Sequence, residues 1–121
     1  MATFIEAVRE GLFEEMERDP SIIVLGEDVG EGGVFRATEG FLDKFGRERV
    51  IDSPLAESSI VGVSIGASLN GLRPVPEIQF SDYIHPAMNQ IINEAAKIRY
   101  LTEGEFHCIL PVFMSTAWTP S

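Results

Sequence analysis

The sequence predicts an α/β fold in which a parallel sheet lies between helices on both of its faces, a three-layer arrangement. Residues 22–25 are Ile-Ile-Val-Leu, a short continuous apolar run that is typical of a strand covered on both faces. An amphipathic helical pattern precedes this run, and a helix that leads into a buried strand favours a layered α/β architecture. The right-handed crossover rule then places helices on both sides of the sheet.

Length and composition limit the chain to one domain. It has 121 residues, of which 45% are hydrophobic, so it can bury a core. The formal net charge is −10, which argues against a nucleic-acid backbone or an anionic membrane as a partner because both would repel the chain. Cys108 is the only cysteine, so an internal disulfide is excluded and a reducing compartment is favoured.

The N-terminal residues predict a helix and a cytoplasmic, prokaryotic protein. Thr3 followed by Glu6 forms a capping box, so a helix is expected to begin almost at Met1, with no room for a transit peptide. Apolar residues at positions 4, 8, 12 and 16 give this helix one core-facing stripe, and Pro20 ends it. Charges recur too often in residues 6–19 for a signal peptide, and no apolar run approaches the ~20 residues of a membrane span.

A glycine-rich stretch, residues 26–33, follows the first strand and resembles a phosphate-binding loop only superficially. The dinucleotide fingerprint would need glycine at position 35, where the chain has Phe35, and three carboxylates would face the phosphates. We therefore interpret it as a flexible surface connection that becomes ordered against a partner. Arg36 and Thr38 are predicted to begin a helix that ends near Phe45, with Gly46 as its left-handed cap.

The second half of the chain continues the alternation of strands and helices. A strand is predicted at residues 50–51, a buried helix at 58–71, and a strand at 75–80, where Pro74 and Pro76 indicate a strand end or a sheet edge. Asp82 can cap a helix over residues 83–101, whose apolar face is wider than one sheet contact requires and suggests a subunit interface. Residues 106–113 are predicted to form another strand.

Glu57 is the first candidate functional residue. It follows Pro54-Leu55-Ala56 and lies in the first turn of the helix predicted at 58–71. A carboxylate at this position is stabilised by the helix macrodipole and by unsatisfied backbone N–H groups, so its spacing alone is also compatible with a simple capping role.

Several motifs together resemble the β subunit of the thiamine-diphosphate-dependent 2-oxo acid dehydrogenases, of the branched-chain or pyruvate type. They are Gly-Glu-Asp-Val-Gly at 26–30, Gly-Gly-Val-Phe-Arg-Ala-Thr at 32–38, Pro-Leu-Ala-Glu at 54–57, Glu-Ile-Gln-Phe at 77–80 and Asn-Glu-Ala-Ala-Lys-Ile-Arg-Tyr at 93–100. The resemblance implies a partial, transketolase-like pyrimidine-binding domain over residues 1–108. Residues 109–121 form an off-pattern tail, where the family continues into a glycine-rich loop and a catalytic histidine, so a truncated chain is expected.

The resemblance assigns four residues to the cofactor site. The glutamate that matches Glu57 hydrogen-bonds the aminopyrimidine ring of thiamine diphosphate and drives its tautomerisation, a role that suits a half-buried carboxyl with a raised pKa. Leu55 and Gln79 would contact the aminopyrimidine end, and Tyr83 would stack or hydrogen-bond near it. Taken without the family, Leu55 is equally a core residue, Gln79 a partner for backbone groups at a strand end, and Tyr83 a side chain packed under its own loop.

The resemblance also implies partners and a reaction. The α subunit of the same enzyme would hold the diphosphate and magnesium, a second β subunit would complete a heterotetramer, and a dihydrolipoyl acyltransferase core would accept the acyl group. The expected function is oxidative decarboxylation of a branched-chain 2-oxo acid or pyruvate with acyl transfer to lipoyl groups, and the chain alone is expected to be inactive. His85 and His107 do not match the catalytic histidine, and no metal site is predicted. The alternative is a non-catalytic α/β interaction module without a complete cofactor site.

Overall fold

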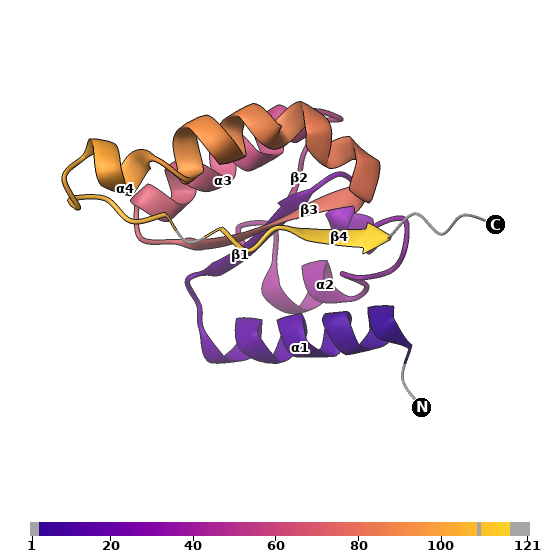
Figure 1. The fold of residues 1–121 in the computed structure, drawn as a ribbon. Coiled ribbons are helices and arrows are strands. Elements are labelled where there is room, and N and C mark those ends of the chain that lie inside the picture. Colours follow the sequence, from indigo (N-terminus) through magenta and orange to yellow (C-terminus); the bar gives the residue numbers. More distant parts are fainter. Residues whose placement is uncertain (1–2, 109, 117–121) are drawn as a thin grey trace.

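The computed structural model describes residues 3–108 and 110–116, and in these residues four parallel strands form one sheet (Figure 1). The strands are β1 (Ile22–Gly26), β2 (Val50–Asp52), β3 (Arg73–Phe80) and β4 (Phe113–Thr116), in the spatial order β2-β1-β3-β4. Each neighbouring pair is parallel. The predicted fold class is therefore confirmed.

Helices cover both faces of the sheet. Helices α1 (Phe4–Arg18) and α2 (Phe41–Phe45) lie on one face, whereas α3 (Glu57–Leu69) and a helical segment over residues 81–101 lie on the other (Figure 1). This segment consists mainly of the 3₁₀ helix η2 (Ser81–Ala87), the π-helical η3 (Gln90–Ala95) and α4 (Ile98–Leu101). A short 3₁₀ turn, η1 (Val29–Glu31), follows β1.

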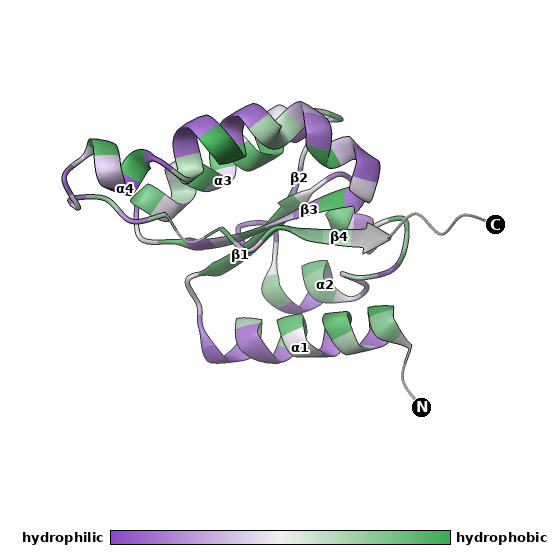
Figure 2. Cartoon of the chain, in the orientation of Figure 1, coloured by the Kyte–Doolittle hydropathy of each residue, from purple (hydrophilic) through white to green (hydrophobic). Residues whose placement is uncertain are grey.

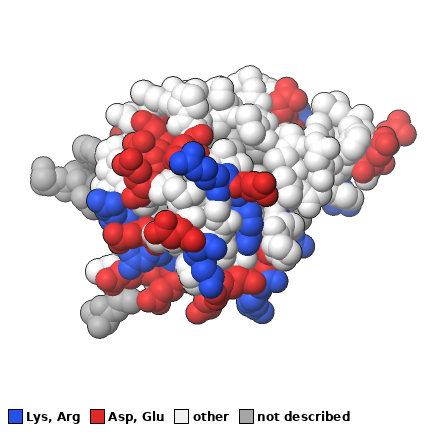
Figure 3. Space-filling model, turned by 180° about the vertical axis from the view of Figure 1, so that it is seen from behind, with Lys and Arg blue, Asp and Glu red and all other residues white. Residues whose placement is uncertain are grey.

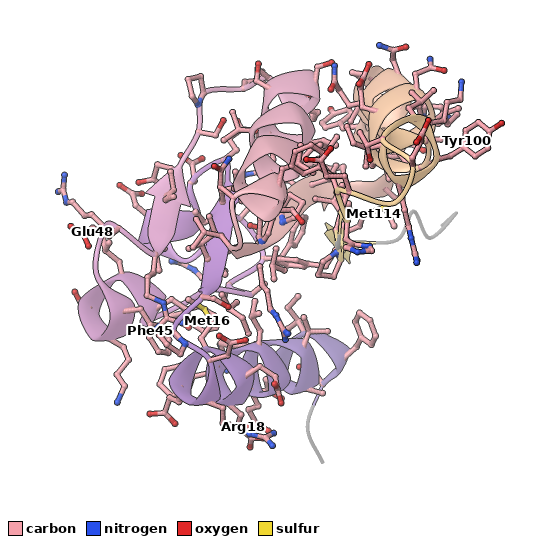
Figure 4. All side chains as sticks on the ribbon, turned by 90° about the vertical axis from the view of Figure 1, so that its left-hand side faces the viewer. Met16, Arg18, Phe45, Glu48, Tyr100 and Met114 are labelled. Carbon is pink, nitrogen blue, oxygen red and sulfur yellow. The ribbon has the colours of Figure 1, made fainter. Side chains whose placement is uncertain are left out.

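Helix α1 begins and ends where the sequence predicts. Thr3 accepts a hydrogen bond from the Glu6 N–H at 3.3 Å and donates its own N–H to Glu6 Oε2 at 2.6 Å, so the capping box is complete. Polar and apolar residues alternate around the helix (Figure 2). Met16 points from it toward the sheet and is fully buried, whereas Arg18 projects away (Figure 4).

The sheet separates two apolar cores. The core on the α1 side contains Met16, Ile22, Val24, Val29, Phe41 and Val50. The core on the α3 side contains Ile23, Leu25, Ile60, Val61, Ile65, Ile78 and Ala87. Successive residues of β1 thus enter opposite cores, and all five of its residues are buried, as expected for a central parallel strand.

The loop after β1 differs from its prediction. Val29, Ala37 and Thr38 are fully buried, so residues 26–38 are a packed loop rather than a flexible surface connection. The helix predicted from Arg36 is also shorter, because Arg36 and Gly40 have left-handed φ angles of 63° and 81° that a right-handed helix cannot contain. Helix α2 therefore starts at Phe41 and ends at Phe45, with the predicted glycine, Gly46, as its C-cap.

Pro74 and Pro76 lie near the start of β3, so the prediction of a strand end is confirmed, whereas that of a sheet edge is wrong because β3 is central. Strand β4 starts later than predicted. The Arg73 N–H donates to Ser21 O, so the backbone N–H of Arg73 faces β1. Successive residues of a strand face the neighbouring strands on opposite sides in turn, so the nitrogens of Pro74 and Pro76 face β4. Prolines have no N–H to donate, and the ladder to β4 begins only at the next residue, Glu77. No strand is assigned to residues 106–108 and 110–112.

The helical segment after β3 is less regular than predicted. Its start at Ser81 has no side-chain cap, so Asp82 does not serve as one, and Pro86 lies inside η2. Ala87 is the only buried residue assigned to η2, η3 and α4, whereas Ile92 and Leu101 are 50% and 67% exposed. Tyr100 projects outward (Figure 4). None of the described helices has the length and apolar character needed to cross a membrane.

Charged side chains are unevenly distributed over the surface. In the rear view they gather on the lower part, where α1 and α2 lie, while much of the upper part, formed by α3 and the 81–101 segment, is uncharged (Figure 3). The sequence explains this difference, because residues 58–72 contain no charged side chain.

Candidate functional site

The candidate site lies at the carboxyl ends of β1, β2 and β3. The chain passes from β1 to β2 on one side and then to β3 on the other side of β1, so the strand order reverses between β1 and β3. Ligands of open α/β sheets bind outside the carboxyl ends of the strands at such a switch point. The strands end there at Gly26, Asp52 and Phe80.

Gln79 joins the two strands that flank the switch point. It is 9% exposed, and its Nε2 donates a hydrogen bond of 3.1 Å to the backbone oxygen of Glu27, the residue after β1. The plainer interpretation of Gln79, a partner for backbone groups at a strand end, is thus confirmed. This bond holds the loop after β1 against the end of β3.

Glu57 opens helix α3 and is partly buried. Ala56, the residue before it, provides no side-chain cap, so Glu57 is an acidic residue in the first turn, as predicted. The next residue, Ser58, donates its hydroxyl to Pro86 O at 3.0 Å and so ties the start of α3 to η2. Glu57 therefore begins α3 beside η2, the segment that follows β3, and its charge acts on Glu27 in the loop after β1.

Glu27 is a further candidate residue that the sequence reasoning did not select. Burial raises the pKa of its carboxyl, and the negative charges of Asp28 and Glu57 raise this pKa further. Its position directly after a buried parallel strand was the available signal, because such positions face the switch point. A carboxyl group whose pKa is raised by burial and by neighbouring charges, beside a strand end, is a candidate for a functional site.

Leu55 and Tyr83, the other two candidates from the sequence, are both exposed. Leu55 is 68% exposed, so its alternative interpretation as a core residue is wrong. The Tyr83 ring is 49% exposed and lies 5.4 Å from the Phe80 ring, which in turn lies 5.3 Å from Phe35 of the loop after β1. These three rings form a row of aromatic contacts that links the loop after β1 to the residues after β3.

The described residues include no group of three or more His, Cys, Asp and Glu side chains placed to hold a metal ion. His107 lines a different hollow, with Arg73 and Glu105, at the amino end of β3.

Comparison with protein families identifies the domain. Residues 1–117 match the transketolase pyrimidine-binding domain. The chain belongs to this family. The match to the pyrimidine-binding domain includes all four strands described above.

Individual relatives are β subunits of 2-oxo acid dehydrogenases. The 2-oxoisovalerate dehydrogenase subunit beta of Bacillus subtilis is 56% identical over 111 residues, 91% of this chain and 34% of the relative. The corresponding subunit of Pseudomonas aeruginosa is 50% identical over 86% of this chain and 30% of the relative, and the pyruvate dehydrogenase E1 component subunit beta of Acholeplasma laidlawii is 47% identical over 86% and 32%.

The resemblance seen in the sequence is confirmed by these relatives. The chain spans about a third of their length. This pyrimidine-binding domain therefore matches only the first part of the subunit. That part includes every candidate residue discussed above.

Proposed function

We propose that this pyrimidine-binding domain acts as part of the β subunit of a 2-oxo acid dehydrogenase and supplies one half of a thiamine diphosphate site. The observation that carries the proposal is the position of Glu57, which lies in electrostatic contact with Glu27 at the switch point of the sheet, in a domain whose family is defined by pyrimidine binding. Oxidative decarboxylation with transfer of the acyl group to lipoyl groups is the reaction that we assign to the complete enzyme.

The residues of the site fit the aminopyrimidine end of this cofactor. Leu55 and Tyr83 expose apolar surface on which a flat ring can lie, and Glu57 offers a carboxyl group for a ring nitrogen. When bound, thiamine diphosphate supplies the carbon nucleophile and electron acceptor that decarboxylation of a 2-oxo acid requires. Glu57 would hold and release the proton shared with the ring, and Gln79 would fix the wall beside it.

A partner subunit is needed for the other end of the cofactor. The loop after β1 carries Glu27, Asp28 and Glu31, whose carboxylates would repel a diphosphate. We therefore assign the diphosphate and its magnesium ion to the α subunit. The few hydrogen bonds and the ring contact that this chain offers contribute roughly 1 kcal/mol each, against an association cost of several kcal/mol, so the chain alone should not bind the cofactor measurably.

The surface of the upper helical layer supports assembly with further subunits. Val63 on α3 is 62% exposed and Ile92 on η3 is 50% exposed, and residues 58–72, which include α3 from Ser58 on, carry no charged side chain. We assign this surface to contacts within a heterotetramer of two α and two β subunits, which would deliver its acyl group to a dihydrolipoyl acyltransferase core. The unpaired Cys108 supports a cytoplasmic location.

For the substrate, we propose a branched-chain 2-oxo acid, with pyruvate as the second candidate. The branched-chain candidate is supported by the two 2-oxoisovalerate dehydrogenase subunits, which share 56% and 50% identity with the chain. The pyruvate candidate is supported by the E1 component subunit at 47%. These identities differ too little for identity alone to decide, so the substrate has to be measured.

A chimaera tests the proposal. The aligned segment of the Bacillus subtilis β subunit is replaced by the 111 matching residues of this chain, and the protein is combined with its α subunit. We expect decarboxylation of 2-oxo acids in the presence of thiamine diphosphate and magnesium, and a comparison of branched-chain substrates with pyruvate identifies the preferred acid.

Substitutions in the same chimaera test the role of the carboxylate. Glu57→Gln should abolish turnover and leave the sedimentation coefficient of the heterotetramer unchanged, because the amide fills the same space but cannot exchange the proton. Glu48→Gln, at an exposed glutamate before β2, is the matched control and should retain activity. Full activity of the Glu57→Gln chimaera would refute the role of Glu57, and micromolar binding of thiamine diphosphate to the isolated chain in calorimetry would refute the half-site.

A further inference from the structure

We propose that Asp52 is a positioning residue whose carboxylate, bound to the backbone of Gly30, fixes the loop of residues 27–38 against the candidate cofactor site. Asp52 is itself outside the set of residues assigned above to the cofactor. The inference rests on the proposed function, since the position of the loop matters for catalysis only if the site binds the cofactor.

The contact between Asp52 and Gly30 is close and specific. Asp52 is the last residue of β2 and lies opposite Gly26 of β1. Its Oδ1 accepts a hydrogen bond of 2.7 Å from the Gly30 N–H, and the N–H of Ser53 donates to Gly26 O at 2.9 Å. A Cβ at position 30 would lie 2.5 Å from Asp52 Oδ2, so a glycine is required for the carboxylate to approach this closely.

The loop that Asp52 binds is tied together internally. The buried hydroxyl of Thr38 donates to Val29 O at 2.8 Å, and the Gly33 N–H donates to Asp28 O at 2.8 Å. The Thr38 N–H also donates to Gly32 O at 3.2 Å. Because these bonds connect the two ends of the loop, a displacement at its middle is transmitted to both ends.

Both ends of the loop contact residues of the candidate site. At one end, the backbone oxygen of Glu27 accepts the hydrogen bond from Gln79. At the other end, the Phe35 ring packs 5.3 Å from Phe80, whose ring lies 5.4 Å from Tyr83. The bond between Asp52 and Gly30 therefore controls the surroundings of two cofactor-facing residues, and of Glu27, whose carboxyl is coupled to Glu57.

A purely stabilising role for Asp52 makes a different prediction. If the carboxylate only strengthened the end of β2, its removal would lower the stability of the fold and leave the electrostatic environment of Glu27 unchanged. A positioning role requires that the environment of Glu27 change whenever the bond is broken, even when the charge of Asp52 is retained.

The test uses nuclear magnetic resonance on the 121-residue chain without cofactor. The carboxyl titration of Glu27 and the amide exchange rate of residue 30 are measured in the unmodified chain and in Asp52→Ala, Asp52→Asn and Gly30→Ala. Asp43→Ala, at an exposed aspartate of α2, is the control. Asparagine keeps an acceptor oxygen without the charge, whereas alanine at position 30 displaces the carboxylate without removing it.

In Asp52→Ala and Gly30→Ala, amide exchange at residue 30 should accelerate by about tenfold or more, because a hydrogen bond to a charged acceptor is lost. The pKa of Glu27 should fall toward its ordinary value in both, as the loop becomes solvated and moves away from Glu57. Asp52→Asn should retain most of both properties, and Asp43→Ala should retain them fully.

Two results would overturn the proposal. Unchanged exchange at residue 30 in Asp52→Ala and Gly30→Ala would show that the bond does not hold the loop, and faster exchange with an unchanged Glu27 titration would show that it does not position the site. If Asp52→Ala does not fold, Gly30→Ala and Asp52→Asn decide the question. Because no cofactor is present, these results are independent of whether the chimaera proves active.

Discussion

Replacement of Arg49 by alanine is expected to destabilise the domain strongly. Arg49 precedes β2, and its guanidinium donates three hydrogen bonds: Nε to Ile22 O at 3.0 Å, and Nη2 to Met16 O at 2.8 Å and Asp19 O at 2.9 Å. It also lies 4.9 Å from the centre of the Phe45 ring. One side chain thus connects the end of α1, the start of β1 and α2.

The size of the effect follows from these contacts. A hydrogen bond with a charged donor contributes about 1.5–3 kcal/mol, but three bonds from one group are not additive and the site is partly exposed to water, so we expect a loss of about 3 kcal/mol. A domain of this length has a total stability on the order of 10 kcal/mol. A loss of this size lowers the thermal midpoint by about 12 °C. Lysine carries the charge but not the planar fork, so Arg49→Lys should lose about 2 kcal/mol.

Urea unfolding followed by circular dichroism measures the change in free energy, provided that the slope of the transition stays constant. Arg47→Ala is the matched control, because Arg47 lies two residues earlier in the same turn and is exposed. The two alanine variants remove the same positive charge from neighbouring positions. If Arg49→Ala and Arg47→Ala had the same stability, the role of Arg49 in connecting these elements would be refuted.

Three further predictions concern the candidate site. Glu57→Gln should lower the pKa of Glu27 but leave it above its ordinary value, because burial and Asp28 continue to raise it; carbon NMR titration measures this. Because the pKa of Glu27 is raised on folding, its contribution to stability is complete below its unfolded pKa and is lost as the pH rises through its folded pKa. Glu27→Gln should therefore reduce the loss of stability between these two pKa values, as measured by urea unfolding at a series of pH values. Thr38→Val removes the buried hydrogen bond to Val29 O and should cost about 1–2 kcal/mol in the same assay, and no loss would contradict the packed loop.

The elements that depend on local signals were predictable from the sequence. The capping box at Thr3 fixes the start of α1, and the left-handed Gly46 fixes the end of α2. The run of residues 22–25 has no polar position and could only be a buried strand or a buried helix, and its length decided for the strand. The position of Glu57 at the start of α3 follows from the apolar residues behind it.

Features that depend on distant contacts were not predictable in this way. Arg36 and Thr38 were predicted to begin a helix. Instead, the Thr38 hydroxyl donates to Val29 O, nine residues away, and Arg36 adopts a left-handed φ. The sequence around Arg49 reads only as a charged turn, since its three acceptors lie 27 to 33 residues away. The late start of β4 likewise depends on whether the nitrogens of Pro74 and Pro76 in β3 face β1 or β4. Only the strand order decides which neighbour they face.

One rule of parallel sheets would have recovered most of the site before the structure was known. All strands of such a sheet end at the same edge, so residues that follow different strands meet there however far apart they are in the sequence. Applied to this chain, the rule selects Glu27 after β1 and Asp52 at the end of β2 together with Gln79 and Glu57. It excludes His107, which lies beside the start of β3 at the opposite edge. The two residues that it adds, Glu27 and Asp52, both make contacts in or with the loop after β1. The geometry of the sheet, more than the type of each residue, therefore determines which side chains are candidates for the site.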